Sequence, residues 1–205
     1  MKDNTNKNFW QRFAKIYDPF MKSSAPLYSE ICDEIKQQLS RNMDVLELAC
    51  GSGQLSFKLS NYVKTYEATD FSDQMINEAK KKQKGSRLHF SVQDATNLPY
   101  ADSSFDAVVI SNALHIMPYP EKALAEIKRV LKKEGILFAP TFIHGESTGY
   151  RIKIKMMEAV GFHTYSKWSE ESFSEFLIQN GFTPKKHKII GDTLAPLCYM
   201  ECTIN

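Results

Sequence analysis

An apolar segment that runs directly into a Gly-x-Gly turn has the strongest capacity for ligand chemistry in this sequence. It reads Val45-Leu-Glu-Leu-Ala-Cys-Gly-Ser-Gly-Gln-Leu55, with Gly51 and Gly53 in the turn. Glycine lets the backbone approach a ligand closely, and the first N–H groups of a following helix are free to bind it. The segment therefore predicts a strand, a ligand-binding turn and a helix.

The residues around this turn discriminate between two classes of ligand. A dinucleotide site needs a third glycine three positions beyond Gly53, for the pyrophosphate and for close helix packing, and that position holds Ser56. Glu47 places a negative charge at the carboxyl end of the strand. Such a charge repels a pyrophosphate but suits the ammonium or sulfonium group of S-adenosylmethionine (SAM), so the electrostatics favour a cationic ligand.

Further polar side chains fall where the next expected strands end. Asp70 follows Gly53 by 17 residues and can accept hydrogen bonds from ribose hydroxyls, a pattern that NAD and SAM sites share. Asp94 follows the third expected strand and can accept a hydrogen bond from an adenine amino group. His115 and His144 follow the fourth and fifth, and each is a candidate general base.

Strand-like and helix-like segments alternate along the chain, which determines how these residues are positioned. Strands are expected at 43–49, 65–70, 87–92, 105–111 and 135–142, with helices at 54–63, 72–84 and 120–132. Alternating elements of these lengths form right-handed βαβ units around a parallel sheet. The sequence therefore predicts an α/β, doubly wound, Rossmann-like fold, whose ligands bind at the carboxyl ends of the strands.

The ends of the chain are expected to cover this sheet. An aromatic-rich helical leader occupies residues 1–40, and a small cap insertion that contributes to the substrate region follows the fifth strand at 145–180. The last two strand-like runs, 185–190 and 197–203, are separated by too short a turn for a parallel crossover, so they are expected to pair antiparallel. One domain, 1–205, is expected.

Composition gives little indication of partners. The chain has 26 Lys and Arg against 24 Asp and Glu, a net charge of +2, so neither nucleic acid nor stable membrane association is expected. The basic and apolar stretch 151–157 is interpreted as a pocket wall or solvated helix face. Four scattered cysteines form no disulfide framework or zinc-site spacing, so no metal is expected, and the polar amino terminus predicts a cytoplasmic location. The oligomeric state is left open.

Five sequence blocks, in order and at matching spacing, resemble the class I SAM-dependent methyltransferases, in particular the small-molecule (methyltransferase type 11-like) group. The blocks are 45–53, 70–75, 94–100, 104–108 and 129–135. Two departures are Ala49 in place of the first glycine of the loop and Glu47 in place of the more usual aspartate. We expect the Ala49 methyl group to be tolerated with a negative φ. The resemblance also implies a seven-stranded, mostly parallel sheet with an antiparallel last strand.

The resemblance assigns roles to individual residues of a cofactor site. It implies that the methionine part of SAM lies against the loop of Glu47, Ala49, Gly51 and Gly53, and that Asp70 binds the ribose. It places Phe71 and Met75 beside the adenine, Asp94 and Ala95 at the adenine edge, and Ser111 under the sulfonium. Tyr17 matches a leader tyrosine that closes over the cofactor. Without the motif, Phe71 and Met75 would be interpreted as core residues.

The activity that the resemblance implies is in-line transfer of the SAM methyl group to a small-molecule acceptor, which leaves S-adenosylhomocysteine (SAH). In such a reaction the protein supplies alignment, desolvation and sometimes a base. Nucleic-acid amino-methylating enzymes are disfavoured, because the fourth strand leads to Ser111-Asn-Ala-Leu114 and not to a D/N-P-P-Y/F/W motif. Cytosine-methylating enzymes are disfavoured because no Pro-Cys nucleophile is present. Two alternatives stay open: a SAM-binding module without transfer activity and, less favoured, a nicotinamide-dependent oxidoreductase. The acceptor and the atom methylated are also left open.

Overall fold

The structure, a computed structural model, describes residues 5–143, 158, 161–191 and 196–205. Its strands are β1 (Asp44–Leu48), β2 (Thr65–Asp70), β3 (Leu88–Val92), β4 (Phe105–Ile110), β5 (Leu131–Phe138), β6 (Thr141–Phe142), β7 (Phe182–Ile190) and β8 (Leu197–Ile204). Its α-helices are α1 (Thr5–Met21), α2 (Ala25–Ile35), α3 (Ser56–Leu59), α4 (Asp73–Lys82), α5 (Pro120–Val130) and α7 (Glu170–Gln179). Short 3-10 helices are η1 (Lys22–Ser24), η2 (Ser60–Tyr62) and η3 (Leu114–Ile116).

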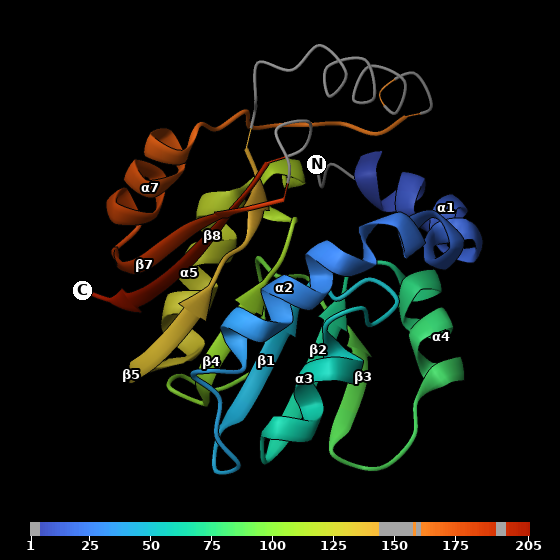
Figure 1. Cartoon of the computed structure of the whole chain (residues 1–205), viewed down its shortest axis with the longest axis horizontal. Coiled ribbons are helices and arrows are strands. Elements are labelled where there is room, and N and C mark those ends of the chain that lie inside the picture. The colour runs from blue at the N-terminus through green and yellow to red at the C-terminus, as the bar shows by residue number, and fades with distance from the viewer. Residues whose placement is uncertain (1–4, 144–157, 159–160, 192–195) are drawn as a thin grey trace.

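All described strands belong to one sheet, ordered β3-β2-β1-β4-β5-β8-β6, with β7 paired to β8 (Figure 1). The first five strands of this order are parallel. In the register, Leu48 of β1 lies beside Thr69 of β2 and Ile110 of β4, so the carboxyl ends of the three strands meet at one edge. The predicted α/β fold is confirmed, and the residues after these strands lie close together.

The terminal strands add the antiparallel part of the sheet. β8 pairs antiparallel with both β5 and β7, as expected for the terminal pair. The expected fifth strand is divided at Pro140, which has no N–H for the ladder. Ala139 still donates to the Met200 carbonyl at 2.9 Å, and pairing with β8 resumes at Thr141 opposite Cys198. Counted as one interrupted strand, β5 and β6 bring the described sheet to the seven strands expected.

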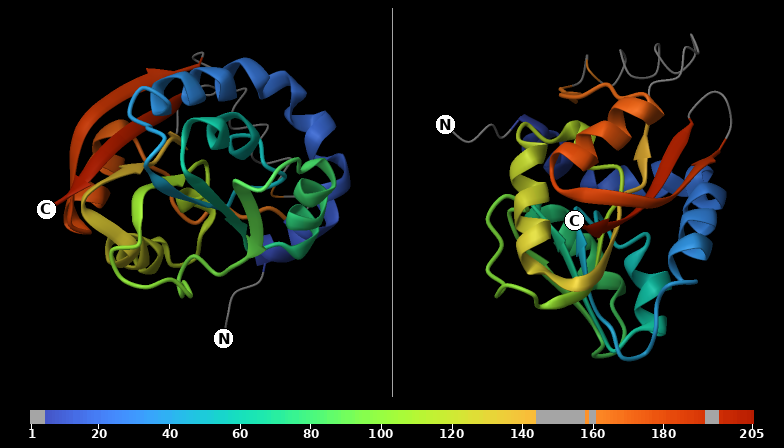
Figure 2. Two further views of the ribbon diagram at one scale, coloured as in Figure 1. Left: turned by 90° about the horizontal axis from the view of Figure 1, so that it is seen from below. Right: turned by 90° about the vertical axis from the view of Figure 1, so that its left-hand side faces the viewer.

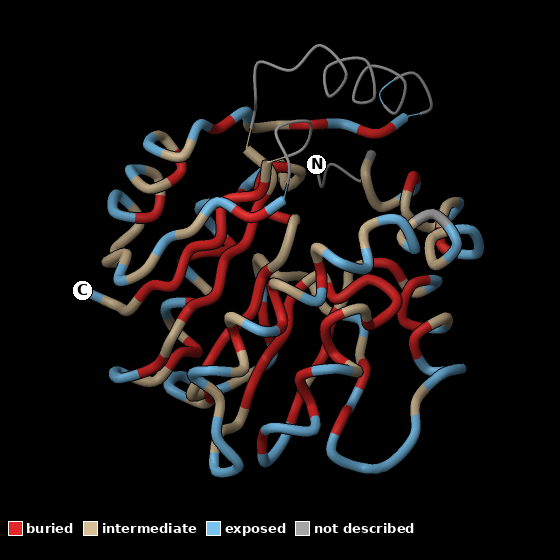
Figure 3. The backbone as a smooth tube through the Cα atoms, viewed as in Figure 1, coloured by how far each residue is buried: buried red, intermediate tan, exposed pale blue. Residues whose placement is uncertain are grey.

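Helices cover both faces of the sheet (Figure 2). One core cluster joins α2, α3 and α4 to the sheet, and a second joins α5 and α7 to the opposite face. The backbone coloured by burial shows buried residues running along the central strands (Figure 3). All four cysteines are buried free thiols.

Element boundaries differ from the expectation where the chain tightens or pairs over long range. The helix expected at 54–63 is a short α3 that tightens into η2 at Ser60, in a stretch of Ser and Asn that favours turns over helix. β5 begins already at Leu131, which pairs with Phe105 before a bulge. β7 begins at Phe182 and accommodates Pro184 at a bulge, as an edge strand can.

The leader helix α1 lies against α4 beside the carboxyl edge of the sheet (Figure 1). Phe9 is buried, and the Trp10 ring lies 5.7 Å from the Tyr17 ring and 5.9 Å from the Phe162 ring, measured between centroids. Within the part of the chain described, no helix is long and apolar enough to cross a bilayer. Most of the expected cap before residue 161, with the stretch 151–157, lies outside the described residues.

Candidate functional site

A cavity of about 560 Å³ opens where the parallel strands end, between the sheet and α1. Residues that follow β1, β2, β3 and β4 line it, together with one face of α1. The structure brings all but one of the predicted cofactor residues to this cavity, namely Tyr17, Glu47, Ala49, Gly51, Asp70, Phe71, Met75, Asp94, Ala95 and Ser111. Gly53 lies in the adjoining turn and is not among the lining residues.

The two glycines of the turn are required by backbone conformation and by close neighbours. Gly51 has φ +56°, and a Cβ at this position would lie 3.3 Å from Cε1 of Tyr17. Gly53 has φ +92°, and a Cβ there would lie only 2.6 Å from Cε2 of Phe57. The Tyr17 ring therefore rests directly on the turn, and Gly53 permits the turn to pack against α3.

Ala49 has φ +54°, so the expectation of a negative φ at this position is wrong. Hydrogen bonds of the backbone that follows Ala49 hold this conformation: Cys50 N donates to the Thr69 carbonyl at 2.9 Å, and Gly53 N donates to the Cys50 carbonyl at 3.0 Å. A left-handed conformation costs a non-glycine residue ~1–2 kcal/mol. The turn therefore keeps its path at the expense of local strain at Ala49.

Glu47 is the most deeply buried acid of the cavity, with 2% of its surface exposed. Its Oε2 accepts hydrogen bonds from Ser56 Oγ and, at 3.0 Å, from Tyr66 Oη. Burial raises the pKa of Glu47 to about 7, although these two hydrogen bonds oppose the shift. The expected fixed negative charge is thus a titrating one, and a nearby cationic ligand would favour its ionised form.

Asp70 joins the glycine turn to the loop that follows β2. Its Oδ2 accepts from Gly51 N at 2.9 Å and its Oδ1 from Ser72 N at 2.8 Å. Burial raises the pKa of Asp70, while these backbone N–H groups favour the carboxylate. Ser72, not Asp70, caps α4, because its Oγ accepts from Met75 N. The Asp70 oxygens each keep a lone pair that a ribose hydroxyl can use.

The residues after β3 line the cavity together with Phe71 and Met75, which follow β2. Asp94 Oδ1 accepts from Thr96 N at 3.0 Å and from Thr96 Oγ1 at 2.7 Å, which fixes the turn that carries Ala95. Met75 is 2% exposed, and the Phe71 ring lies 4.2 Å from the Lys7 ammonium. These positions fit the predicted adenine-side residues, whose individual roles stay predictions.

The residues after β4 present buried polar atoms to the cavity. Ser111 Oγ and Asn112 Oδ1 are buried and have no hydrogen-bond partner among the described residues. Asn112 Nδ2 donates to Tyr28 Oη at 3.3 Å, and Tyr28 is in turn hydrogen-bonded to Tyr17. A buried polar atom left unpaired costs about 1–3 kcal/mol, so this part of the cavity is suited to a hydrogen-bonding ligand.

Of the two histidines proposed as bases, the structure brings one to the cavity. His115 in η3 is buried, lines the cavity, and has its Nδ1 3.1 Å from Thr141 Oγ1. His144 lies outside the described residues. The role of His115 as a base stays a prediction.

Several lining residues were not identified from the sequence: Trp10, Met21, Tyr28, Asn112, Ile116, Met117, Phe142 and Phe162. Asn112 carried a usable signal, because it directly follows Ser111 at the end of β4. Phe162 carried none, since it reaches the cavity from a segment with no motif. The leader aromatics were noted, but spacing alone does not distinguish a cavity wall from core packing.

Comparisons with known proteins agree with this geometry. Residues 46–139 match a family model described as a methyltransferase domain. The demethylmenaquinone methyltransferase of Leptospira interrogans is 36% identical over 149 residues, which are 66% of this chain and 57% of the relative. The chain therefore matches little more than half the length of that relative.

Solved structures share the fold at low identity. A SAM-dependent methyltransferase of Thermotoga maritima superposes with a TM-score of 0.75 at 21% identity, covering 97% of this chain and 99% of that one. The magnesium protoporphyrin IX methyltransferase of Synechocystis, solved with bound SAH, gives 0.68 at 17% identity, covering 89% and 84%. Taken with the motif blocks and the strand-end cavity, these similarities identify residues 46–139 as a methyltransferase domain that uses SAM as its cofactor. The solved structures show that the described chain has the fold of the SAM-dependent methyltransferases.

Proposed function

We propose that this chain transfers a methyl group from SAM to a small-molecule acceptor. The observation that carries the proposal is the division of the cavity along the strand order. Its β1, β2 and β3 side holds the acids Glu47, Asp70 and Asp94, whereas its β4 and β6 side and α1 supply mainly aromatic and apolar groups. A polar cofactor and an apolar acceptor would thus meet above β1 and β4.

The cofactor half has matching groups for each part of SAM. Glu47 offers a carboxylate to the ammonium group, and Asp70 offers both oxygens to the ribose. The unpaired Ser111 Oγ and Asn112 Oδ1 lie where the polar groups near the sulfonium would pair with them. The buried acid Glu47 also opposes binding of a nicotinamide dinucleotide, whose pyrophosphate is an anion.

An aromatic ring that carries hydroxyl groups, a quinol, is the acceptor class we favour. Trp10, Met117, Phe142 and Phe162 line the acceptor half, and flat aromatic ligands pack well against such side chains. The Leptospira relative acts, by its name, on demethylmenaquinone. The near balance of charge over the chain gives no attraction for nucleic acid.

The chain's own residues then align the reactants and move one proton. SAM supplies an already activated methyl group. The quinol hydroxyl gives its proton to His115, held by Thr141, and electron density moves to the adjacent ring carbon. A carbon–carbon bond forms as the carbon–sulfur bond breaks, which leaves SAH. The methylated ring carbon then releases its proton to solvent, and protonated His115 returns its proton to the oxygen, which restores the aromatic quinol. The α1 aromatics exclude water from the methyl transfer itself.

Label transfer tests the proposal. The full chain is incubated with methyl-labelled SAM and a reduced naphthoquinone, and the product mass is measured. This quinol has an unsubstituted carbon among the two substitutable carbons of its quinone ring. The matched control is the same quinol with both of these carbons methylated. Label on the first compound alone supports carbon methylation of a quinol. Label on neither compound, with SAM bound, would favour the non-catalytic SAM-binding module instead.

A further inference from the structure

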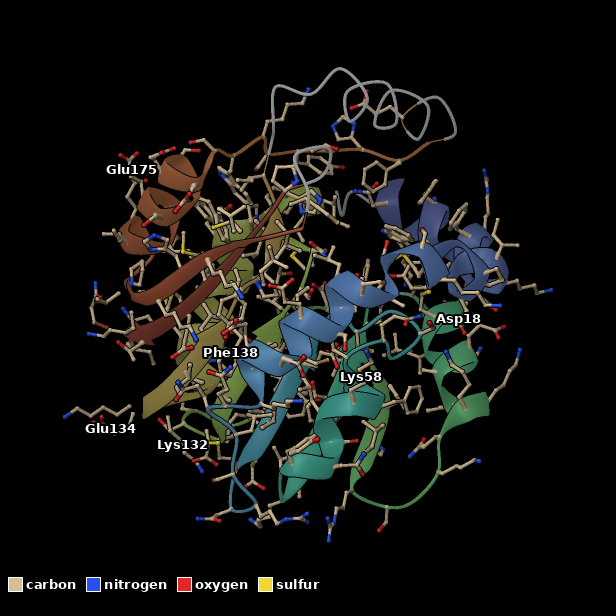
Figure 4. The ribbon with its side chains drawn as sticks, viewed as in Figure 1. Asp18, Lys58, Lys132, Glu134, Phe138 and Glu175 are labelled. Atoms are coloured by element: carbon tan, nitrogen blue, oxygen red, sulfur yellow. The ribbon has the colours of Figure 1, made fainter. Side chains whose placement is uncertain are left out.

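Asp18 lies near the end of α1 (Figure 4). Its hydrogen bonds connect the leader helix to the glycine turn. Its Oδ1 accepts hydrogen bonds from Ser52 Oγ and from Gln54 Nε2, the latter at 3.0 Å. Its Oδ2 accepts from Lys82 Nζ at 2.6 Å, in the last turn of α4. Burial opposes ionisation of Asp18, but the hydrogen bonds from Lys82, Ser52 and Gln54 outweigh it and lower the pKa.

The two contacts to the turn fall on residues that matter for the cavity. Ser52 is fully buried, and Gln54 lines the cavity. They flank Gly53, so Asp18 holds both sides of the tightest part of the turn. On the other side, Asp70 holds the same turn through Gly51 N at 2.9 Å. Two carboxylates therefore fix the turn, one from the sheet and one from the leader.

The same stretch of α1 places an aromatic ring on the turn. Tyr17, the neighbour of Asp18, rests on Gly51 and lines the cavity. A second polar contact, from Gln11 Nε2 to Asp73 Oδ1 at 2.6 Å, holds α1 against α4. Because Asp18 also binds Lys82 of α4, one carboxylate links α1, α4 and the turn.

We propose that Asp18 is a positioning residue, which holds turn residues 51–54 and the Tyr17 ring in the arrangement that binds the amino-acid part of the cofactor. Binding of that part then depends on docking of the leader. The identity of the ligand rests on the proposed function. An exposed ion pair such as Asp18 with Lys82 contributes little to stability by itself. The contacts to Ser52 and Gln54 carry the effect.

Calorimetry on the full chain tests this role with two ligands. SAH contains the amino-acid part, and methylthioadenosine lacks it. Asp18→Ala should weaken SAH binding by about tenfold or more, because the turn loses two charge-assisted hydrogen bonds. Methylthioadenosine affinity should stay within about twofold, because this ligand lacks the amino-acid part that the turn binds. For comparison, a tenfold change in affinity corresponds to ~1.4 kcal/mol. Asp18→Asn retains an acceptor oxygen and should fall between. Glu78→Gln, which breaks the exposed Glu78–Lys81 pair on α4, is the matched control.

Equal weakening of both ligands, or unchanged SAH affinity, would overturn the proposal. Tryptic digestion without ligand adds a readout that does not depend on the cofactor. Asp18→Ala should be cut faster than Glu78→Gln after the exposed residues Arg12 and Lys15 of α1. Equal cutting rates would also overturn it. If the wild-type chain binds neither ligand, the proposed function is contradicted. If the wild type binds SAH and Asp18→Ala binds it equally well, only the role of Asp18 is contradicted.

Discussion

Glu47 is expected to make the ligand-free protein less stable as the pH rises. Burial raises its pKa from the usual 4.5 to about 7. Between these values the folded state holds a proton that the unfolded state has released, so the free energy of unfolding falls through this window and levels off above it. A shift of this size corresponds to a loss of ~3 kcal/mol.

Replacing this residue with glutamine removes the titration and keeps the shape. In Glu47→Gln, the amide oxygen can still accept from Ser56 and Tyr66. Near pH 5 both proteins carry a neutral side chain and should be similarly stable. At about pH 8 the variant should be more stable by ~3 kcal/mol, a rise in Tm of ~6–12 °C for a chain of this size.

Thermal unfolding of the ligand-free proteins across this pH range measures the difference. Glu78→Gln, at a partly exposed site on α4, serves as the control and should parallel the wild type. The stabilised Glu47→Gln should nevertheless bind SAH more weakly, because it lacks the charge for the ammonium group. Parallel pH dependence of Glu47→Gln and wild type would refute the reasoning, as would a variant less stable at high pH.

Three further substitutions probe other parts of the site. Asp70→Ala should weaken SAH binding by at least about tenfold in calorimetry and lower the Tm, since Gly51 and Ser72 N–H lose their acceptor; unchanged affinity would exclude a ribose role. Ala49→Gly should raise stability to urea by about 0.5–1 kcal/mol, because strain at positive φ outweighs the added freedom of the unfolded chain; a loss would show that methyl packing dominates. His115→Gln should lower quinol methylation while SAH affinity is kept, and undiminished turnover would remove it as the base.

Much of the fold could be predicted because its strands carry local signals. The segment 105–110 is apolar almost throughout, and the structure buries it on both faces as a central parallel strand. The boundaries of the elements were predicted wrongly where strand pairing joins residues that are far apart in the sequence. Leu131 joins β5 because it lies opposite Phe105, a contact that no local pattern encodes. The interruption at Pro140, in contrast, could have been predicted from the sequence, because proline has no N–H to donate to the ladder.

The site was predictable where function fixes residue type at a strand end. Glu47 and Asp70 were identified this way, and both line the cavity. The φ of Ala49 was misjudged, although the glycine of the family pattern at this position was itself a signal for positive φ. Asp18 was not identified, because its partners lie 34, 36 and 64 residues away in the chain. Such contacts follow from the docking of α1.

Titration of the wild-type chain with SAM, SAH and NAD tests the central claim most directly. The site around Glu47, Asp70 and Ser111 predicts that SAM and SAH bind, and that either ligand at ~100-fold excess over its Kd adds ~2.7 kcal/mol of stability. Near neutral pH, binding should also release protons, because the ammonium group favours ionised Glu47. NAD should have no effect. Binding of NAD, with none of SAM or SAH, would contradict the account.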